Sequence, residues 1–213
     1  MARRTLHLAG EPAADALLTD DPLALLIGMV LDQQIPLERA FAAPAELARR
    51  LGRDLDAADL AGMDPAELAA AFSQRPALHR FPGSMAGRVQ ALCQEVVDTY
   101  GGDAARVWTD ATTGAQLLAN VKALPGFGEQ KARIFVALLG KQLKVRPKGW
   151  QEASEPFGEP GSHRSIADII DQASLDQVRA YKAAMKAAKA ADPASAAAAP
   201  TTGRQPARRA GGR

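Results

Sequence analysis

The sequence predicts an all-α protein, and three observations support this fold class. Hydrophobic residues make up 47% of the 213 residues but aromatic residues only 5%, so the core must be built from aliphatic side chains. Ala-rich and Leu-rich stretches with few β-branched runs favour helix over strand. No segment alternates polar and apolar residues with the period of two that a half-buried strand requires.

Charge and cysteine content narrow the function classes. The formal net charge is +2 and the sequence pI is about 8.8, a balance too mild to demand a nucleic-acid partner. The single cysteine, Cys93, excludes an internal disulfide and any zinc or iron–sulfur site built from several cysteines of one chain. Since it lies among Val89, Leu92 and Val96, we expect it in the core. We expect no secretory signal and no transmembrane helix.

The first strong element begins at Asp21-Pro22. Aspartate can cap a helix by accepting backbone N–H groups, and proline fits the first helical position. The helix Leu23–Leu31 carries apolar residues on nearly every face, which predicts that it is buried all round. It ends in Asp32-Gln33-Gln34, an unusual polar group at the end of a buried helix. Pro36 then separates it from a helix over Leu37–Leu51.

Capping residues, helix-stopping glycines and apolar spacing of three and four predict the remaining elements. The predicted helices are a short one from Asp64 to about Phe72, Ser84–Tyr100, Gly114–Ala123, Glu129 to about Leu139, Ser165–Asp171 and Leu175–Lys189. The stretch Gly149–Gly161 holds two prolines and three glycines and is predicted to be a loop.

Residues 190–213 form a segment of different composition. It is rich in Ala, Pro, Gly, Thr and Arg and is predicted to be a disordered tail, because it cannot bury enough apolar surface to fold. Its arginines would either be solvated or touch DNA without sequence preference; they are Arg204, Arg208, Arg209 and Arg213.

The most specific motif is Leu124–Ala132, in which Gly126 and Gly128 flank Phe127 between two predicted helices. Glycine permits positive φ and a close approach of the backbone to another molecule. The amides of the turn and of the following helix start would form an anion site, reinforced by the helix dipole. Lys131 would place a cation beside the same phosphate, and Phe127 would fill the space between the two helices. The pattern fits a grip on the DNA backbone that reads phosphate and not sequence.

An ordinary αα-hairpin that uses its glycines only for the turn is the alternative. The Leu-Pro pair before the glycines and Lys131-Ala132 after them favour DNA. The segment resembles the helix-hairpin-helix motif of the base-excision DNA glycosylases (HhH-GPD), which include endonuclease III, the adenine-mismatch glycosylase and the bacterial alkyladenine glycosylases. Leu26–Gln34 resembles that family's buried helix, which ends in a Gln-bearing loop facing DNA. Arg88 with Val89 and Leu92 resembles its helix before the hairpin.

The resemblance implies a two-lobed helical domain over residues 1–189, with a cleft between the lobes, that binds double-stranded DNA. Gln33 or Gln34 would probe or fill the gap left by an extruded base. It also implies a monovalent cation, K⁺ or Na⁺, on the backbone of Leu124 and Gly126. With no secretory signal and no transmembrane helix expected, we expect a monomer of the cytoplasm that associates with the nucleoid when it binds DNA. The DNA-binding residues implied are Gln33, Gln34, Arg88, Pro125, Gly126, Phe127, Gly128 and Lys131.

The sequence departs from the family where catalysis is concerned. The family has an aspartate a little under two dozen residues after the hairpin, where a carboxylate stabilises positive charge on the sugar. The corresponding stretch, Leu143–Trp150, contains no carboxylate. The replacement would be Asp32 or Asp168, or else Asp171. Near the latter two, His163 and Arg164 could bind a phosphate or an extruded base.

The lysine of the family's lyases also has no counterpart at its own position. Gln130 stands there and Lys131 follows by one residue, so phosphate contact by Lys131 is the favoured interpretation over a Schiff base. The iron–sulfur cysteines of endonuclease III are absent as well. The favoured function is a monofunctional glycosylase that uses an activated water, without metal catalysis and without strand cleavage. The alternatives are a catalytically inactive DNA-binding protein and a helical interaction module that binds no DNA.

Several side chains have a structural alternative to their functional interpretation. Asp32 could cap the next helix, and the two glutamines could only solvate a helix end or form an amide network. Asp168 and Asp171 could belong to a solvated helix face. Trp108 and Trp150 could stack on a base or pack within the protein.

Overall fold

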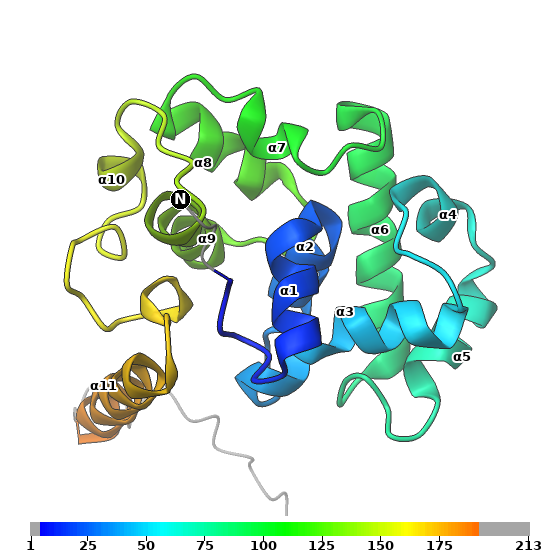
Figure 1. The fold of residues 1–213 in the computed structure, drawn as a ribbon, viewed down its shortest axis with the longest axis horizontal. Coiled ribbons are helices and arrows are strands. Elements are labelled where there is room, and N and C mark those ends of the chain that lie inside the picture. Colours follow the sequence, from blue (N-terminus) through cyan, green and yellow to red (C-terminus); the bar gives the residue numbers. More distant parts are fainter. Residues whose placement is uncertain (1–4, 192–213) are drawn as a thin grey trace, which may run out of the picture.

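Helix α2 (Pro22–Leu31) lies at the centre of the molecule, with the other helices around it (Figure 1). Every residue of α2 after its initial proline is buried, as its all-round apolar sequence predicts. The carboxylate of Asp21 accepts hydrogen bonds from two first-turn amides at 2.8 and 3.2 Å, which is the predicted cap. The central helix is therefore defined by its own sequence.

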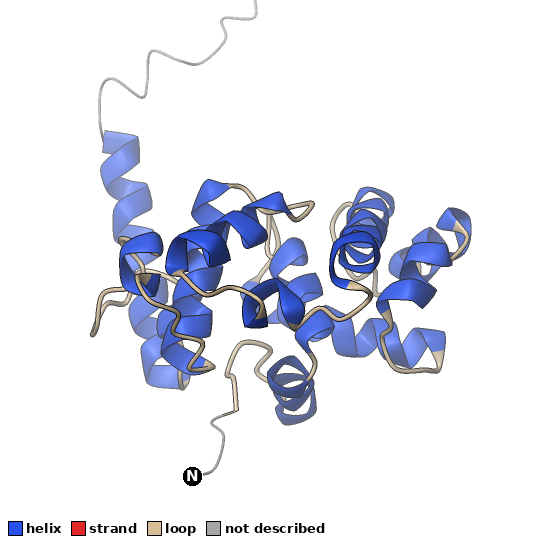
Figure 2. Ribbon diagram, turned by 90° about the horizontal axis from the view of Figure 1, so that it is seen from above, coloured by secondary structure: helices blue, strands red, loops and turns tan. Residues whose placement is uncertain are grey.

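The computed structural model describes residues 5–191, and this part of the chain contains helices but no β-strand (Figure 2). The predicted all-α fold class is confirmed. Residues 192–213, most of the predicted tail, lie outside the described part. The other elements are α1 (Pro12–Asp20), α3 (Leu37–Leu51), α4 (Ala57–Gly62), α5 (Pro65–Ser73), α6 (Pro82–Tyr100), α7 (Arg106–Thr109), α8 (Gly114–Ala123), α9 (Glu129–Gln142), α10 (Trp150–Ala153), the 3₁₀ helix η1 (Ile166–Asp168) and α11 (Gln172–Ala191).

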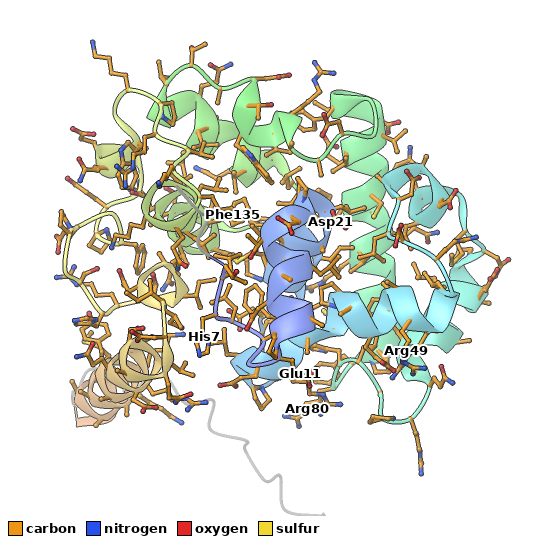
Figure 3. The ribbon with its side chains drawn as sticks, viewed as in Figure 1. His7, Glu11, Asp21, Arg49, Arg80 and Phe135 are labelled. Carbon is orange, nitrogen blue, oxygen red and sulfur yellow. The ribbon has the colours of Figure 1, made fainter. Side chains whose placement is uncertain are left out.

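The helices form two lobes that share one apolar core. Helices α1 to α6 pack mainly on one another, and α7 to α11 with η1 pack mainly on one another. Phe135 of α9 is fully buried (Figure 3), with Trp108 at 5.9 Å and Phe127 at 5.7 Å between ring centroids. The C-terminal end of α2 reaches the second lobe, where the side chain of Val30 faces the backbone of Gly126. The end of α2 therefore contributes to the part of the shared core that lies in the second lobe.

Residues with structural alternatives largely take the structural role. Cys93 is fully buried, and burial raises the pKa of its thiol to about 12. Trp108 is a core residue. Trp150 packs so closely on α9 that a Cβ at Gly140 would lie 2.2 Å from its ring. Both tryptophans therefore support the second lobe by packing. Among residues 5–191, no helix has the length and apolar character needed to cross a bilayer.

The sequence missed the short helices and some boundaries. Helix α1 begins at Pro12, after Glu11, whose side chain makes no cap, and α4 has only six residues, too few to show a period. The predicted loop Gly149–Gly161 was wrong at its start, where α10 forms one turn. The predicted helix Ser165–Asp171 is the shorter η1, and α11 begins at Gln172, earlier than predicted. Local propensity is weak in elements this short, so packing against neighbours decides them.

Arg50 of α3 joins its helix to the segment that follows α5. Its side chain is 2% exposed and pairs with Glu46 at 2.7 Å. Its guanidinium also donates to three backbone carbonyls, those of Ala71 at 2.7 Å, Gln74 at 3.0 Å and Pro76 at 2.7 Å. The segment held in this way leads directly to α6, so Arg50 fixes the approach to that helix.

Arg50→Ala is expected to lower the free energy of unfolding by about 2–3 kcal/mol, because buried charge-assisted hydrogen bonds are lost and carbonyls lose their donor. Arg49→Ala is the matched control, since Arg49 pairs with the same Glu46 at 2.6 Å but its side chain is 68% exposed. Exposed pairs contribute less than about 1 kcal/mol. Urea denaturation of both variants measures the difference, and equal losses would contradict the assignment.

Candidate functional site

The hairpin between α8 and α9 has the predicted form. The backbone N–H of Phe127 donates to the carbonyl of Leu124 at 3.1 Å, which closes the turn. Gly126 has φ +89°, a conformation that side chains with a Cβ rarely adopt. Phe127 is 6% exposed and packs against the ring of Phe135, so it supports the turn from inside. The structure therefore corrects the expectation that Phe127 contacts DNA, because its side chain lies inside the hairpin.

The amide face of the hairpin is open to solvent. Gly126 and Gly128 are both exposed, and no side chain of the described residues caps the first turn of α9. A Cβ at Gly128 would meet nothing within 4 Å, whereas one at Gly126 would lie 3.2 Å from the side chain of Val30. Gly126 is thus required by the protein itself, and Gly128 leaves free space for another molecule. Uncapped amides at a helix start are suited to bind an anion.

The carboxylate of Glu129 lies at the start of α9, and its effect on anion binding was not considered in the prediction from sequence. Glu129, in the first turn of α9, would repel a phosphate by itself. It forms ion pairs with Lys122 of α8 and with Arg133 of α9, the latter at 2.8 Å. Lys122 first and Arg133 second hold the pKa of Glu129 below its ordinary value. The local balance is one carboxylate against two cations, so the surface around the amides stays positive.

Gln33 belongs to a network at the end of α2. Its amide nitrogen donates to the carbonyl of Val30 at 2.7 Å, and its amide oxygen accepts from Arg88 of α6 at 3.0 Å. The ring of His79 holds the backbone of this residue. Because the amide of Phe81 donates to Nδ1 at 3.0 Å, the other ring nitrogen, Nε2, carries the hydrogen and donates to the Gln33 carbonyl at 2.8 Å. The amide-network alternative therefore describes Gln33, and Arg88 orients it.

Gln34 has the opposite character. It is exposed and has φ +58°, a left-handed conformation that costs an ordinary residue roughly 1–2 kcal/mol. Strained backbone of this kind is found most often at binding sites.

Phe81, two residues after His79, is an exposed aromatic residue. Its side chain is 43% exposed, and the guanidinium of Arg80 (labelled in Figure 3) lies 5.4 Å from the centre of its ring. The sequence interpretation missed Phe81, which only its exposure reveals.

Asp32 lies in a pocket between α2, α9, η1 and α11. The pocket measures about 290 Å³, close to the lower limit of roughly 300 Å³ for small-ligand sites. Its lining residues are Met29, Asp32, Gln130, Lys131, Ile134, Ser165, Ile166 and Lys182. Burial raises the pKa of the Asp32 carboxyl above its ordinary value of 3.8, while Lys182 and then Lys131 oppose the rise. A carboxylate of raised pKa in an apolar-walled pocket is typical of an active site.

Lys131 faces this pocket and not the outer side of the hairpin. Its ammonium donates to the carbonyls of Met29 at 2.6 Å and Val30 at 3.3 Å, at the buried C-terminal end of α2. Burial lowers its pKa, and the charge of Asp32 opposes that effect. The expectation of a phosphate contact is thus corrected: the end of a buried helix needs donors, and Lys131 supplies them.

The comparisons with known proteins agree with this geometry. Residues 27–198, well over half of the chain, match the family model described as HhH-GPD superfamily base excision DNA repair protein. The chain belongs to the HhH-GPD superfamily. No curated protein and no solved structure matches it. The matched range begins inside α2 and includes both the hairpin and the Asp32 pocket, so the family assignment rests on the same elements as the site.

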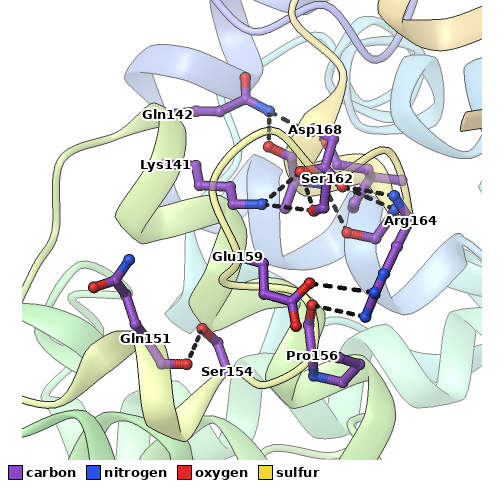
Figure 4. A network of polar contacts seen from close by, with 12 residues as sticks. Lys141, Gln142, Gln151, Ser154, Pro156, Glu159, Ser162, Arg164 and Asp168 are labelled. Atoms are coloured by element: carbon purple, nitrogen blue, oxygen red, sulfur yellow. Dashed lines mark hydrogen bonds and ion pairs between the residues drawn. The ribbon is translucent and has the colours of Figure 1, made fainter. Parts of the chain in front are cut away.

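In this HhH-GPD protein the second candidate carboxylate, Asp168, is occupied by structural contacts (Figure 4). It pairs with Lys141 at 2.6 Å and accepts hydrogen bonds from Ser162 and from the amides of Arg164 and Ser165. Its side chain is 4% exposed and forms a capping box with Ser165 at the start of η1. Four donors leave it little capacity to act on a substrate.

The other predicted residues are placed as follows. His163 is exposed and lines a separate pocket with Lys141 and Asp168, away from the lining of the Asp32 pocket. Asp171 is exposed and accepts the amide of Ser174 at 2.8 Å, a cap at the start of α11. Of the three candidate carboxylates, the structure brings only Asp32 to the hairpin. No group of three or more His, Cys, Asp or Glu side chains suited to a metal occurs within residues 5–191.

Asp32→Asn is expected to raise the free energy of unfolding at pH 7. The folded protein binds the Asp32 proton more tightly than the unfolded chain does. Stability is therefore lost as the pH rises from the unfolded value, about 4, through the raised folded pKa. Asparagine imitates the protonated form, so the gain should vanish as the pH falls toward 4. Urea denaturation at pH 4 and pH 7 measures it.

Asp168→Asn is the control with the opposite sign. It breaks a buried ion pair and should cost about 3 kcal/mol at pH 7, because Lys141 is left without its partner. An Asp32→Asn variant less stable than the wild type at pH 7 would contradict the interpretation of Asp32 as a strained, functional carboxylate.

Proposed function

We propose that the protein is a monofunctional DNA glycosylase that hydrolyses the N-glycosidic bond of a damaged or mismatched base in double-stranded DNA. The observation that carries this proposal is the position of Asp32. Its carboxylate lies one residue before the Gln33–Gln34 loop and in the same pocket as Gln130 and Lys131, from the first turn of α9. A catalytic group that acts on an extruded nucleotide must lie between the hairpin that binds the phosphate and the residues that fill the gap left by the base. Asp32 lies in this position.

The hairpin would hold the DNA backbone. The exposed amides at Gly126, Gly128 and the start of α9 would donate to a phosphate, with Lys122 and Arg133 as the surrounding cations. Since these contacts go to backbone oxygens, they fix the register of the protein on DNA without reading sequence. Pro125 is half-buried in the turn and shapes it.

Gln34 and Phe81 would enter the base stack as the target base leaves it. Both are exposed, and His79 joins their two segments, because it hydrogen-bonds the backbone of Phe81 and of Gln33, the residue before Gln34. An amide can replace the lost base-pair hydrogen bonds, and an aromatic ring can fill the stack. Arg88, which holds the Gln33 amide, is exposed and would also reach the DNA backbone.

Asp32 would perform the chemistry once the base lies in the pocket. Met29, Ile134 and Ile166 supply apolar walls for the base. As the C1′–N bond breaks, positive charge develops on the sugar and the Asp32 carboxylate stabilises it. A water molecule, oriented by the same carboxylate, adds to C1′ and leaves a hydroxyl group there. The proton that the water releases neutralises the base, which departs with the electron pair of the C1′–N bond. Because the Lys131 ammonium is held by two carbonyls, we assign it no Schiff-base role and expect no strand cleavage.

A structural monovalent cation at the hairpin remains part of the proposal. The Leu124 carbonyl accepts one hydrogen bond, from Phe127, and its second lone pair can still bind K⁺ or Na⁺ together with the carbonyl of Gly126. We also propose that the protein acts as a monomer, in the cytoplasm and on the nucleoid. The competing proposal, a lesion-binding protein without catalysis, is favoured by the lack of any carboxylate in residues 143–150.

The two hairpin glycines separate folding from DNA binding. Gly126→Ala should destabilise the protein by more than about 1 kcal/mol, because of the positive φ and the contact with Val30. Gly128→Ala should leave stability unchanged or slightly higher, yet weaken binding to duplex DNA at least about tenfold, because a methyl group would stand where a phosphate approaches. Thermal unfolding and salt-dependent binding titrations measure the two effects. Unchanged DNA binding by Gly128→Ala would exclude the hairpin as the contact.

Excision is tested with a panel of lesion-bearing and mismatched duplexes, followed by alkali. The wild type should leave an abasic site, seen as an alkali-labile strand, with at least one substrate. Asp32→Asn should lower the single-turnover rate by a factor on the order of 10²–10⁴. Asp168→Asn, assayed at a temperature where it is folded, should keep its rate. Absence of product from every duplex, with DNA binding retained, would favour the lesion-binding protein instead.

A further inference from the structure

Three charged side chains converge on the pocket from different elements. Asp32 follows the last residue of α2, Lys131 lies in the first turn of α9, and Lys182 lies in the middle of α11. The carboxylate therefore faces two cations. Neutral polar groups of the lining are Gln130 and Ser165, and Arg88 acts on this cluster through Lys131.

The two lysines are held differently. The ammonium of Lys131 is fixed by the carbonyls of Met29 and Val30, and the end of α2 dictates its position. Lys182 makes no hydrogen bond and no ion pair within 4 Å with any residue that the structure describes. Of the two, Lys182 has the larger effect on Asp32. The lysine without a hydrogen bond of its own is thus the one with the larger electrostatic effect on the Asp32 carboxylate.

The register of α11 aims Lys182 at the pocket. Leu175 and Val178 are buried against the second lobe, and Lys182 follows Val178 by four residues on the same helix face. Arg179 forms an ion pair with Glu38 of α3, which ties α11 to the first lobe. Residues 181–188 are all exposed, so after this anchor the helix leaves its packing partners behind. The C-terminal half of α11 is therefore exposed to solvent, and Lys182 is its residue that lines the pocket.

We propose that Lys182 is a positioning residue, the cation that keeps the Asp32 carboxylate charged for base excision. The inference rests on the proposed function, because Asp32 has a catalytic task only there. Burial of Asp32 favours its neutral form, which cannot stabilise positive charge on the sugar. A second cation opposes that effect, and its placement on an exposed helix costs the core nothing.

The first experiment measures the charge of Asp32 directly, without any substrate. A carbon NMR titration of aspartate-labelled protein follows the Asp32 carboxyl, with Asp32→Asn to assign its signal. Lys182→Ala should move the pKa of Asp32 upward, and Lys182→Arg should restore it. Lys186→Ala is the matched control, because Lys186 lies one turn further on the same helix and outside the pocket lining. It should leave the titration unmoved.

The second experiment follows single-turnover excision against pH. In Lys182→Ala the acid limb of the profile should move to higher pH, with about a tenfold lower rate on that limb for each unit of movement, and the rate should recover as the pH rises. Alanine favours helix and Lys182 is exposed, so the variant should fold like the wild type.

The outcomes are separable. An Asp32 titration that is unchanged in Lys182→Ala overturns the inference, whatever the enzyme does. So does an excision defect of equal size at every pH, which would make Lys182 a DNA phosphate contact. A titration that moves while no duplex is ever excised shows that the proposed function has failed and removes the positioning role with it. A moved titration together with a moved acid limb supports the inference.

Discussion

The site depends on one constraint, which is that α2 is buried on every face and must satisfy its carbonyl end inside the protein. A helix leaves its last carbonyls without partners, and water is not available at the centre of two lobes. Two side chains therefore supply the donors. The ammonium of Lys131 comes from the second lobe, and the side-chain amide of Gln33 comes from the loop that follows α2. This requirement brings the hairpin helix α9 against the end of α2, and the pocket around Asp32 forms at that junction.

The same junction explains why the two hairpin glycines differ. Gly126 lies against Val30 of α2, so it belongs to the contact between the lobes, while Gly128 faces open space. The turn is thus fixed on its inner side and free on its outer side. A phosphate grip needs this combination, because amides can bind a ligand without reorganisation only if the backbone behind them is rigid. The family match over residues 27–198 covers both halves of this arrangement.

Much of the fold could be predicted from the sequence, but less of the site. Strong local signals were sufficient for α2, α3, α8 and the hairpin, where caps, prolines and apolar spacing agree with one another. The short elements α4 and α10 escaped because a few residues carry too little propensity to predict a helix without their packing partners. Sequence analysis could not decide which of Gln33 and Gln34 would enter the DNA, or which of Asp32 and Asp168 would be catalytic. Each pair consists of the same residue type, so the local sequence offers no difference between its members.

The amino-acid sequence is sufficient to predict that this chain is helical, that one helix is buried on all sides, and that two glycines form the turn before α9. These features follow from composition and local spacing, which act over a few residues. The packing of distant helices is needed to show that Asp168 is engaged by Lys141 and its capping box and that Lys131 faces inward. It is also needed to show that Lys182 lines the same pocket as Asp32, which lies 150 residues earlier in the chain. The reason is physical: which donor satisfies which acceptor depends on how distant helices pack, and no local pattern contains that information.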